Sequence, residues 1–232
     1  MGDIIRIEKL SKIYRIGQER VIALKDVNLN IKEGEICCVL GTSGSGKSTL
    51  LNMIAGLEKP TVGRIIIKNI YIINEMNENK LAKFRQESVG FVFQAYNLLD
   101  SLTAKENVAM PLVFMGASKK VRNKRAVQML ENVGLLTHIK HKPTQMSGGQ
   151  QQRVGIARAF VGKPDIVFAD EPTGNLDSKT SREIMELMVN LIKKNKRTMV
   201  MVTHDHELSG YADKVVKISD GQIEEIIIQN TV

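Results

Sequence analysis

The spacing of hydrophobic and polar positions along the chain changes between two periods. Residues 4–14 and 21–31 alternate apolar with polar side chains, which predicts two half-exposed strands. The apolar run GEICCVLG at 34–41 predicts a buried strand, and KSTLLNMIAGL at 47–57 has helical spacing. The first part of the chain therefore predicts a strand, a glycine-rich loop and a helix in direct succession.

The rest of the chain continues this alternation after one interruption. Further strands are predicted at 63–69, 88–94, 165–172 and 197–205, a helix at 181–195, and a closing hairpin at 213–226 around Asp220 and Gly221. From about residue 97 to 160 strand character is lost and helical spacing prevails. We predict an α/β core with an inserted α-helical subdomain.

Composition sets limits on this picture. A chain of 232 residues with 43% hydrophobic content can bury a full core. No run approaches the about 18 apolar residues of a membrane span, and the start has no apolar secretory core, so we expect a cytoplasmic protein. The adjacent Cys37 and Cys38 lie in the buried-strand pattern and predict reduced core thiols.

The net charge of +8 results from 33 Lys and Arg against 25 Asp and Glu. The cations are scattered, and aromatic residues make up only 4%, too few for a surface that stacks bases. No nucleic-acid partner is expected.

The stretch GTSGSGKS, Gly41 to Ser48, fits the phosphate-loop pattern between a predicted strand and a predicted helix. Its glycines let backbone N–H groups surround a polyphosphate, Lys47 places a cation on the terminal phosphates, and Ser48 can bind Mg²⁺. Thr49 adds a side-chain hydroxyl that is expected to contact a phosphate. The residues expected to line the ATP phosphates are Gly41, Ser43, Gly44, Ser45, Gly46, Lys47, Ser48 and Thr49.

An acidic pair, Asp170 and Glu171, ends the apolar strand at 165–172. In a parallel sheet the ligand lies beyond the carboxyl edge, where Asp170 can hold Mg²⁺ and Glu171 can take a proton from the attacking water. The alternative for the pair taken alone is helix capping.

A second loop, MSGGQQQR at 146–153, places a serine and two glycines before a helical segment. Such a loop can also bind an anion at a helix N-terminus. Three single residues, Tyr14, Gln94 and His204, each follow or lie in an apolar strand. They could stack on a base, hold a metal-bound water and reach a phosphate, respectively, but packing or exposure also explains each one, so none is evidence of function when taken singly.

Taken together and in this order, these segments resemble the ATP-binding cassette ATPases over essentially the whole chain. The resemblance implies that Tyr14 stacks on adenine, that Gln94 senses Mg²⁺ and the partner, and that His204 contacts the γ-phosphate. It also implies a purpose for the second loop, because in this family the serine–glycine loop of one subunit faces the nucleotide held by the other. The residues expected to act in trans are Ser147, Gly148, Gly149, Gln150 and Asp177.

The family implies a P-loop core with an N-terminal antiparallel β subdomain and an inserted helical subdomain. We expect one nucleotide-binding domain over 1–232, with the core and β subdomain at 1–94 and 161–232 and the helical signature subdomain at 95–160. With motifs for both halves of a composite site intact, a second copy of the chain is the expected partner, bound in the presence of ATP.

Further sequence segments, such as RVIALKDVNLNI and ADEPTGNLDSKT, resemble those of one subgroup of the family, the lipoprotein-release, macrolide-exporter, antimicrobial-peptide-resistance and cell-division ATPases. This implies a separate membrane permease, docked at the helical subdomain and the Gln94 region, which holds the chain at the inner face of the cell membrane. The alternative is a cell-division or signalling ATPase that relays conformational change through a membrane partner without transport. Cassettes of DNA repair are disfavoured, because the interval between the two loops has no sustained heptads.

Overall fold

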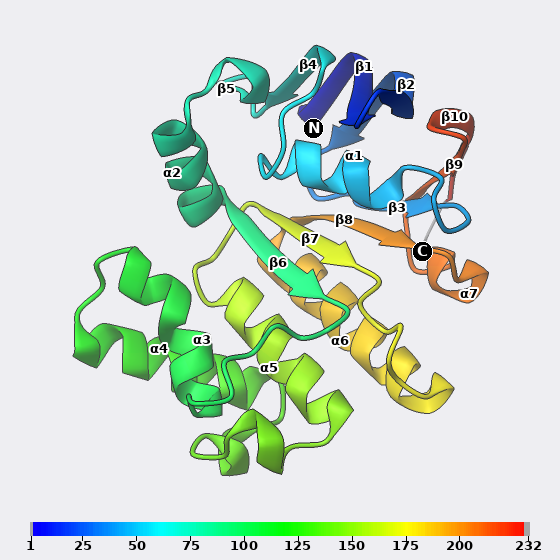
Figure 1. Ribbon diagram of the computed structural model, residues 1–232. Coiled ribbons are helices and arrows are strands. Elements are labelled where there is room, and N and C mark those ends of the chain that lie inside the picture. The colour runs from blue at the N-terminus through cyan, green and yellow to red at the C-terminus, as the bar shows by residue number, and fades with distance from the viewer. Residues whose placement is uncertain (1, 230–232) are drawn as a thin grey trace. The chain divides into compact units, whose positions relative to one another are not determined.

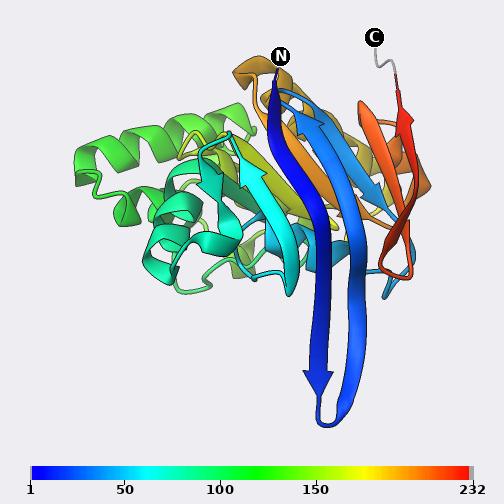
Figure 2. The same cartoon turned by 90° about the horizontal axis from the view of Figure 1, so that it is seen from above.

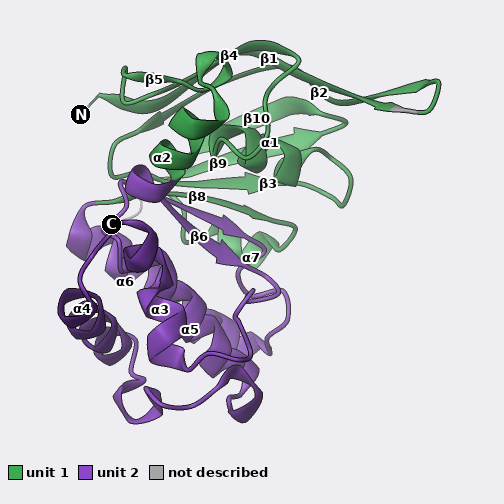
Figure 3. Ribbon diagram, turned by 60° about the vertical axis from the view of Figure 1, so that its left-hand side comes forward, with its two compact units in different colours: residues 1–85, 197–232 green, residues 86–196 purple. Residues whose placement is uncertain are grey.

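A computed structural model describes residues 2–229 and divides into two compact units (Figures 1 and 3). Unit 1 comprises residues 1–85 and 197–232, and unit 2 comprises residues 86–196. Unit 2 is thus inserted in the sequence of unit 1. The narrower limits of 95 and 160 for a helical subdomain stay a prediction, because unit 2 also includes strands on either side of that block.

Unit 1 begins with an antiparallel sheet. Its strands are β1 (Asp3–Ile16), β2 (Glu19–Lys32), β4 (Val62–Ile67) and β5 (Tyr71–Ile72), in the order β2-β1-β4-β5. Figure 2 shows β1 and β2 as a long hairpin. Buried Ile5, Ile7 and Leu10 break strict alternation, because the register shifts between Ile7 and Leu10. The predicted antiparallel β subdomain is confirmed.

The second sheet of unit 1 is mainly parallel. In it, β3 (Ile36–Leu40) pairs in parallel with β8 (Thr198–Thr203) and with β9 (Lys214–Ser219). Every residue of β3 is buried, including the free thiols Cys37 and Cys38, and burial raises the pKa of Cys37 far above its usual value. A strand buried on both faces reads as a continuous apolar run, as 34–41 predicted.

The predicted closing hairpin is present as β9 and β10 (Gln222–Ile228). Asp220 and Gly221 both have positive φ, at 46° and 74°, as a two-residue turn of type I′ requires. The Asp-Gly pair therefore determines this connection.

The helices of unit 1 are α1 (Lys47–Ile54), which packs against β8, α2 (Glu78–Ser88), and the short α7 (His206–Ser209). A 3-10 turn, Ile73–Glu75, precedes α2. No element was predicted over most of α2, which buries Leu81 and Phe84 three residues apart, with the Phe84 ring 5.2 Å from that of Tyr71. Its single apolar stripe was too short to stand out in a polar segment.

Unit 2 contains one parallel strand pair, β6 (Val89–Phe93) with β7 (Ile166–Asp170). Its helices are α3 (Ala104–Phe114), α4 (Lys119–Asn132), α5 (Gly148–Phe160) and α6 (Ser178–Asn195), with 3-10 turns at Leu136–His138 and Pro143–Gln145. Helices α3, α4 and α5 pack on one another, and α5 also packs on β6 and α6. The predicted absence of strands between 97 and 160 is confirmed.

The four helices of unit 2 begin at side-chain caps. The capping residues are Thr103, Ser118, Ser147 and Asp177, each of which accepts a backbone N–H of the first turn. Helix α1 of unit 1 differs, because it begins after Gly46 with no side-chain cap. No helix within residues 2–229 is long and apolar enough to span a membrane.

Candidate functional site

The loop between β3 and α1 in unit 1 is tightly packed around its glycines. Gly44 and Gly46 have φ of 81° and 102°, values that side-chain-bearing residues rarely adopt. A Cβ on Gly46 would lie 2.5 Å from the carbonyl oxygen of Ala23, and one on Gly41 would lie 2.3 Å from that of Ile218. Backbone surrounds the loop, so these glycines are required by its shape.

Two buried polar groups lie in this loop. Lys47 is 7% exposed, and its Nζ donates to the carbonyl oxygen of Thr42 at 2.7 Å. No ion pair to Lys47 occurs among the described residues, and the Oγ of buried Ser45 has no hydrogen-bond partner there. A buried cation without a counter-ion is costly. With the uncapped N-terminus of α1 beside it, the loop fits a bound polyphosphate.

His204 follows the strand next to the phosphate loop. Strands β3 and β8 run in parallel with Leu40 opposite Thr203, and the N–H of Gly41 donates to the carbonyl oxygen of Thr203 at 3.4 Å. The residues that come next, Gly41 and exposed His204, therefore leave the sheet at the same edge. This edge is where a parallel sheet binds its ligand.

Tyr14 is joined to the helix that follows the phosphate loop. Its hydroxyl donates to Glu58 Oε2 at 2.7 Å, and Lys12 Nζ lies 5.0 Å from the ring centroid. The pKa of Tyr14 is raised, first by burial and also by Glu58, while a hydrogen bond with the Thr49 side chain opposes the increase. Tyr14 and Thr49 are thus brought together, and their predicted contacts with adenine and phosphate stay predictions.

The acidic pair of unit 2 lies at the carboxyl end of its strand pair. Asp170 is opposite Phe93, so Gln94 and Glu171 follow neighbouring strand ends. Glu171 has a φ of 46°, a strained value of the kind that gathers at functional sites. Gln94 Nε2 donates to Asn175 Oδ1 at 3.3 Å, and Asn175 Nδ2 donates to the Gln94 carbonyl at 3.0 Å.

Two residues of this region were missed by sequence reasoning. Asn175 holds Gln94 in place, and fully buried Gln152 of α5 donates from Nε2 to the carbonyls of Phe93, at 3.3 Å, and Pro172. Gln152 therefore ties the helix of the second loop to both strand ends. Its place as the third glutamine of a run was the available signal, since it is the one of the three on the buried face.

The second loop forms hydrogen bonds and packing contacts within unit 2. Ser147 Oγ accepts from Gln150 N at 3.3 Å, and Ser147 N donates to Gln150 Oε1 at 3.0 Å, which is a capping box. A Cβ on Gly148 would lie 2.8 Å from Tyr96 Oη, and one on Gly149 would lie 2.7 Å from Thr180 Cγ2. Packing alone thus gives a reason for both glycines.

Asp177 caps α6. It accepts from the backbone N–H groups of Lys179 and Thr180, and Thr180 Oγ1 donates to it at 2.6 Å. These hydrogen bonds, those from Thr180 above all, lower the pKa of Asp177. The expected role of Asp177 across a subunit interface stays a prediction.

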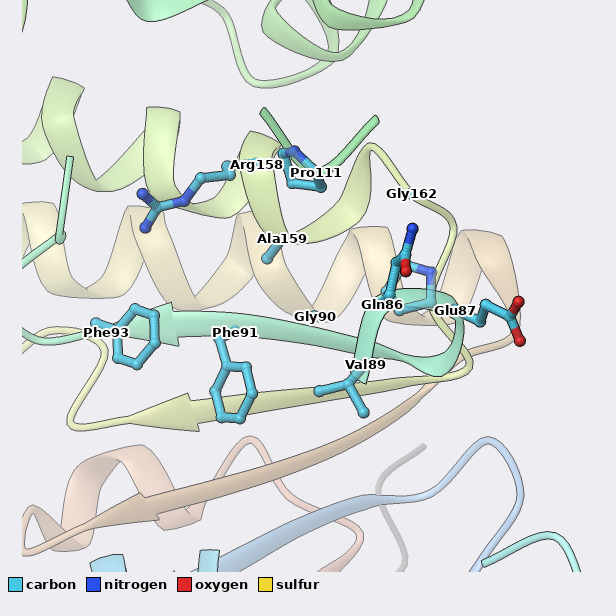
Figure 4. Close-up of a pocket in the computed structure, with 11 residues that line it drawn as sticks. Gln86, Glu87, Val89, Gly90, Phe91, Phe93, Pro111, Arg158, Ala159 and Gly162 are labelled. Atoms are coloured by element: carbon cyan, nitrogen blue, oxygen red, sulfur yellow. The ribbon is translucent and has the colours of Figure 1, made fainter. Parts of the chain in front are cut away.

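A hollow of about 190 Å³ lies beside β6 (Figure 4). Phe91 and Phe93 of β6, Pro111 of α3, and Arg158 and Ala159 of α5 are among its lining residues. The guanidinium of Arg158 donates to the carbonyls of Tyr96, at 2.7 Å, and Asn97, and burial lowers its pKa. Tyr96 and Asn97 both have positive φ, so Arg158 holds this segment in a strained conformation.

The donor set expected for Mg²⁺, Ser48, Asp170 and Gln94, supplies a hydroxyl, a carboxylate and an amide oxygen. Within residues 2–229 no group of three or more His, Cys, Asp or Glu side chains could hold a metal. Magnesium is characteristically bound by one or two carboxylates together with water and substrate phosphates. The chemical types of these donors are therefore compatible with Mg²⁺ that arrives with a nucleotide, and binding of Mg²⁺ by these three residues stays a prediction.

Comparisons with known proteins agree with this geometry. The ABC transporter family model matches residues 24–174. The chain is 48% identical to an ABC transporter ATP-binding protein of Methanocaldococcus jannaschii, MJ0796, over 95% of each chain. It is 45% identical to the lipoprotein-releasing system ATP-binding protein LolD of Legionella pneumophila, over 96% of this chain and 98% of LolD.

Its 42% identity to the macrolide export ATP-binding/permease protein MacB of Bartonella henselae covers 95% of this chain and 33% of MacB. Among solved structures, dimeric MJ0796 bound to ADP and Pi, in a post-hydrolysis state, has a TM-score of 0.90 at 44% identity and covers 98% of this chain and 100% of the other. The chain belongs to the ABC transporter family and is an ATP-binding cassette ATPase of that family.

Proposed function

We propose that this cassette hydrolyses ATP in a dimer whose two nucleotides each contact the phosphate loop of one chain and the Ser147 loop of the other. The observation that carries the proposal is the phosphate loop, with a buried cation that lacks a counter-ion and a buried hydroxyl that lacks a partner. The 44% sequence identity to MJ0796, a cassette whose structure was solved as a dimer bound to ADP and Pi, supports the proposal.

In this proposal the chain's own residues divide the chemistry. Lys47 and the N–H groups of its loop bind and orient the phosphates, while Ser48, Asp170 and Gln94 hold Mg²⁺, which offsets phosphate charge when it is bound. Glu171 accepts the proton of the attacking water, and His204 contacts the γ-phosphate. Tyr14 stacks on the adenine.

The test of this assignment is Glu171→Gln, which retains side-chain shape and removes the base. ATP should still bind, hydrolysis should fall by about 10² or more, and an ATP-bound dimer should accumulate. Release of phosphate and size-exclusion chromatography measure the two effects. Glu186→Gln, the same change at an exposed position of α6, is the matched control. Unchanged hydrolysis by Glu171→Gln would remove Glu171 from its role.

The dimer drives a separate membrane permease, which holds the cassette at the inner face of the membrane. Support comes from the segment after Gln94, where Leu99, Val113 and Phe114 are 50%, 43% and 71% exposed, and from the hollow that Pro111 helps to line. Contiguous exposed apolar patches mark interaction surfaces, and the proposal assigns adjacent Val113 and Phe114 to such a patch. Names of relatives that include lipoprotein release and macrolide export support a transport role over a purely signalling one.

Lys105→Glu tests this docking surface. We expect stimulation of the ATPase by the permease to fall by about fivefold, the scale of one favourable surface charge, while basal hydrolysis persists. Glu106 is unsuitable, because its carboxylate forms the capping box with Thr103. Lys193→Glu, at an exposed position of α6, is the control. Equal stimulation of all three proteins would place docking elsewhere.

A further inference from the structure

A chain of hydrogen bonds connects the 3-10 turn Leu136–His138 to Ser147 of the second loop. Ser147 N donates to Gln150 Oε1 at 3.0 Å, and Gln150 Nε2 lies 3.2 Å from His138 Nε2. On the other side of the ring, His138 Nδ1 lies 3.0 Å from Thr137 Oγ1. The Gln150 side chain is thus held at both ends, by the backbone of the residue it caps and by an imidazole.

The protonation state of His138 follows from the orientation of the Gln150 amide. Because the amide oxygen accepts from Ser147 N, the amide nitrogen must face the ring, and it can only donate. His138 Nε2 must therefore accept, so the imidazole is neutral with its proton on Nδ1, where it donates to Thr137 Oγ1. If the ring were protonated, its Nε2–H would face the N–H of the Gln150 amide, and two donors cannot form a hydrogen bond. Turning the amide over would break its hydrogen bond with Ser147 N.

We propose that His138 is a positioning residue for Ser147, acting through Gln150, and that only its neutral form does so. Ser147 is the residue that the proposed dimer offers to the nucleotide of the other chain, so the inference rests on the proposed function. It adds to that function that the second loop is held by an imidazole whose Nε2 can accept from Gln150 only when it carries no proton.

Lysine side chains lie in the same segment as His138 and on the neighbouring helix α3. The His141 ring lies 4.9 Å from that of His138, and His141 Nδ1 is buried without a partner among the described residues. Helix α3 is tied to the same segment, since Ala104 N donates to the His141 carbonyl at 2.8 Å. Charged or titratable groups close to the turn along the chain and on the neighbouring elements include Lys140, His141 and Lys142 in the segment, Lys105 and Glu106 on α3, Glu131 near the end of α4, and Arg153 of α5, whose guanidinium donates to the Val133 carbonyl at 3.2 Å.

Among these groups the carboxylate of Glu106 already accepts from Thr103, and Glu131 is exposed. Helix α5 carries no charged residue in its first turn. A proton on His138 would therefore add to a segment rich in cations while removing the acceptor that Gln150 needs. Both effects loosen the Ser147 cap as pH falls.

The experiment measures ATP-induced dimerisation in the Glu171→Gln background, so that hydrolysis is not involved. The chain of residues 1–232 is compared with its His138→Gln variant from about pH 5.5 to 8.5, where histidines of proteins titrate. A glutamine at 138 offers a carbonyl oxygen to Gln150 at every pH. We expect the dimerisation of the unsubstituted chain to weaken by about fivefold relative to His138→Gln at the acidic end, the scale of one net hydrogen bond.

His138→Leu, which has no acceptor, should weaken dimerisation by about fivefold throughout this range. Lys140→Gln, an exposed change in the same segment, should follow the unsubstituted chain at every pH. Should His138→Leu fail to fold, which thermal unfolding would reveal, the comparison with His138→Gln still decides. Parallel pH profiles for the unsubstituted chain and His138→Gln would overturn the inference.

Failure of the underlying proposal has a different signature. If the ATP-dependent dimer of the proposed function does not exist, then Glu171→Gln forms no ATP-dependent dimer at any pH, whatever residue stands at position 138. If only the inference fails, the dimer forms and its pH profile is insensitive to position 138.

Discussion

The phosphate loop and the Ser147 loop both place serine and glycine before a helix, yet they leave the helix N-terminus in opposite states. Helix α1 begins after Gly46 with no side-chain cap, and buried Ser45 Oγ has no partner among the described residues. Helix α5 begins at Ser147 with a reciprocal capping box from Gln150. One loop is open to a ligand, and the other is closed on itself.

This difference shows how loops made of the same residue types, serine and glycine, can present different groups to a ligand. The open loop has N–H groups left to surround an anion. In the closed loop Ser147 Oγ accepts from Gln150 N, which orients the hydroxyl and leaves its proton to donate outward. In the proposed dimer the phosphate loop therefore holds a nucleotide by itself, whereas the Ser147 loop presents a single oriented donor to a phosphate bound by the other chain.

The largest effect that separates the loops is expected at Gly149. Gly149→Ala should lower ATPase activity by about 10²-fold, because the methyl group displaces the nucleotide that the proposal places there. It also meets Thr180 Cγ2, so activity alone does not separate packing from ligand approach. Adding Thr180→Ser removes that methyl and keeps the hydroxyl that donates to Asp177.

We expect the Gly149→Ala, Thr180→Ser double variant to regain the unfolding temperature of the unsubstituted chain while its ATPase activity stays low. Thr180→Ser alone is the control. Full recovery of ATPase activity in the double variant would mean that Gly149 is needed only for packing.

The smallest effect concerns the other closed cap, Asp177. Its folded-state pKa is lowered by hydrogen bonds from Thr180, so its contribution to stability is present above the unfolded-state pKa and is lost as pH falls through the folded-state pKa. The stability of the chain relative to Asp177→Asn should therefore decrease below about pH 4. Urea unfolding of both proteins measures this, and a difference independent of pH would contradict it.

Much of the fold was predictable because its signals are local. The apolar run of β3, the spacing of GTSGSGKS and the Asp220–Gly221 turn each determine structure within a few residues. Helix α2 was missed, since it is held by contacts with β5 and the loop after α1, such as that of Phe84 with Tyr71 and the hydrogen bond from Arg85 to the Gly56 carbonyl.

The candidate site was predictable as motifs but not as a network. Spacing indicated Lys47, Glu171 and Ser147, which the structure places at a helix start, a strand end and a helix cap. It gave no indication of Asn175 or His138, and only the run of glutamines pointed to Gln152. Each of these side chains contacts a residue that is distant in sequence. Such partners emerge only when the chain is folded.

The central claim is that the open loop of one chain and the closed loop of the other complete one site. Lys47→Ala removes the cation of the first loop, and Gly149→Asp places a carboxylate where the second meets phosphate, so each variant alone should be nearly inactive. In a mixed dimer one site then takes intact Lys47 from one chain and intact Gly149 from the other.

The most direct measurement is the ATPase activity of these two variants after mixing. The account predicts recovery of up to about half of the normal rate per mixed dimer, if one site can act alone in a symmetric pair. A mixture no more active than its separate components, together with ATP-dependent crosslinks between cysteines beside Ser43 and Ser147 that form only within single chains, would contradict it.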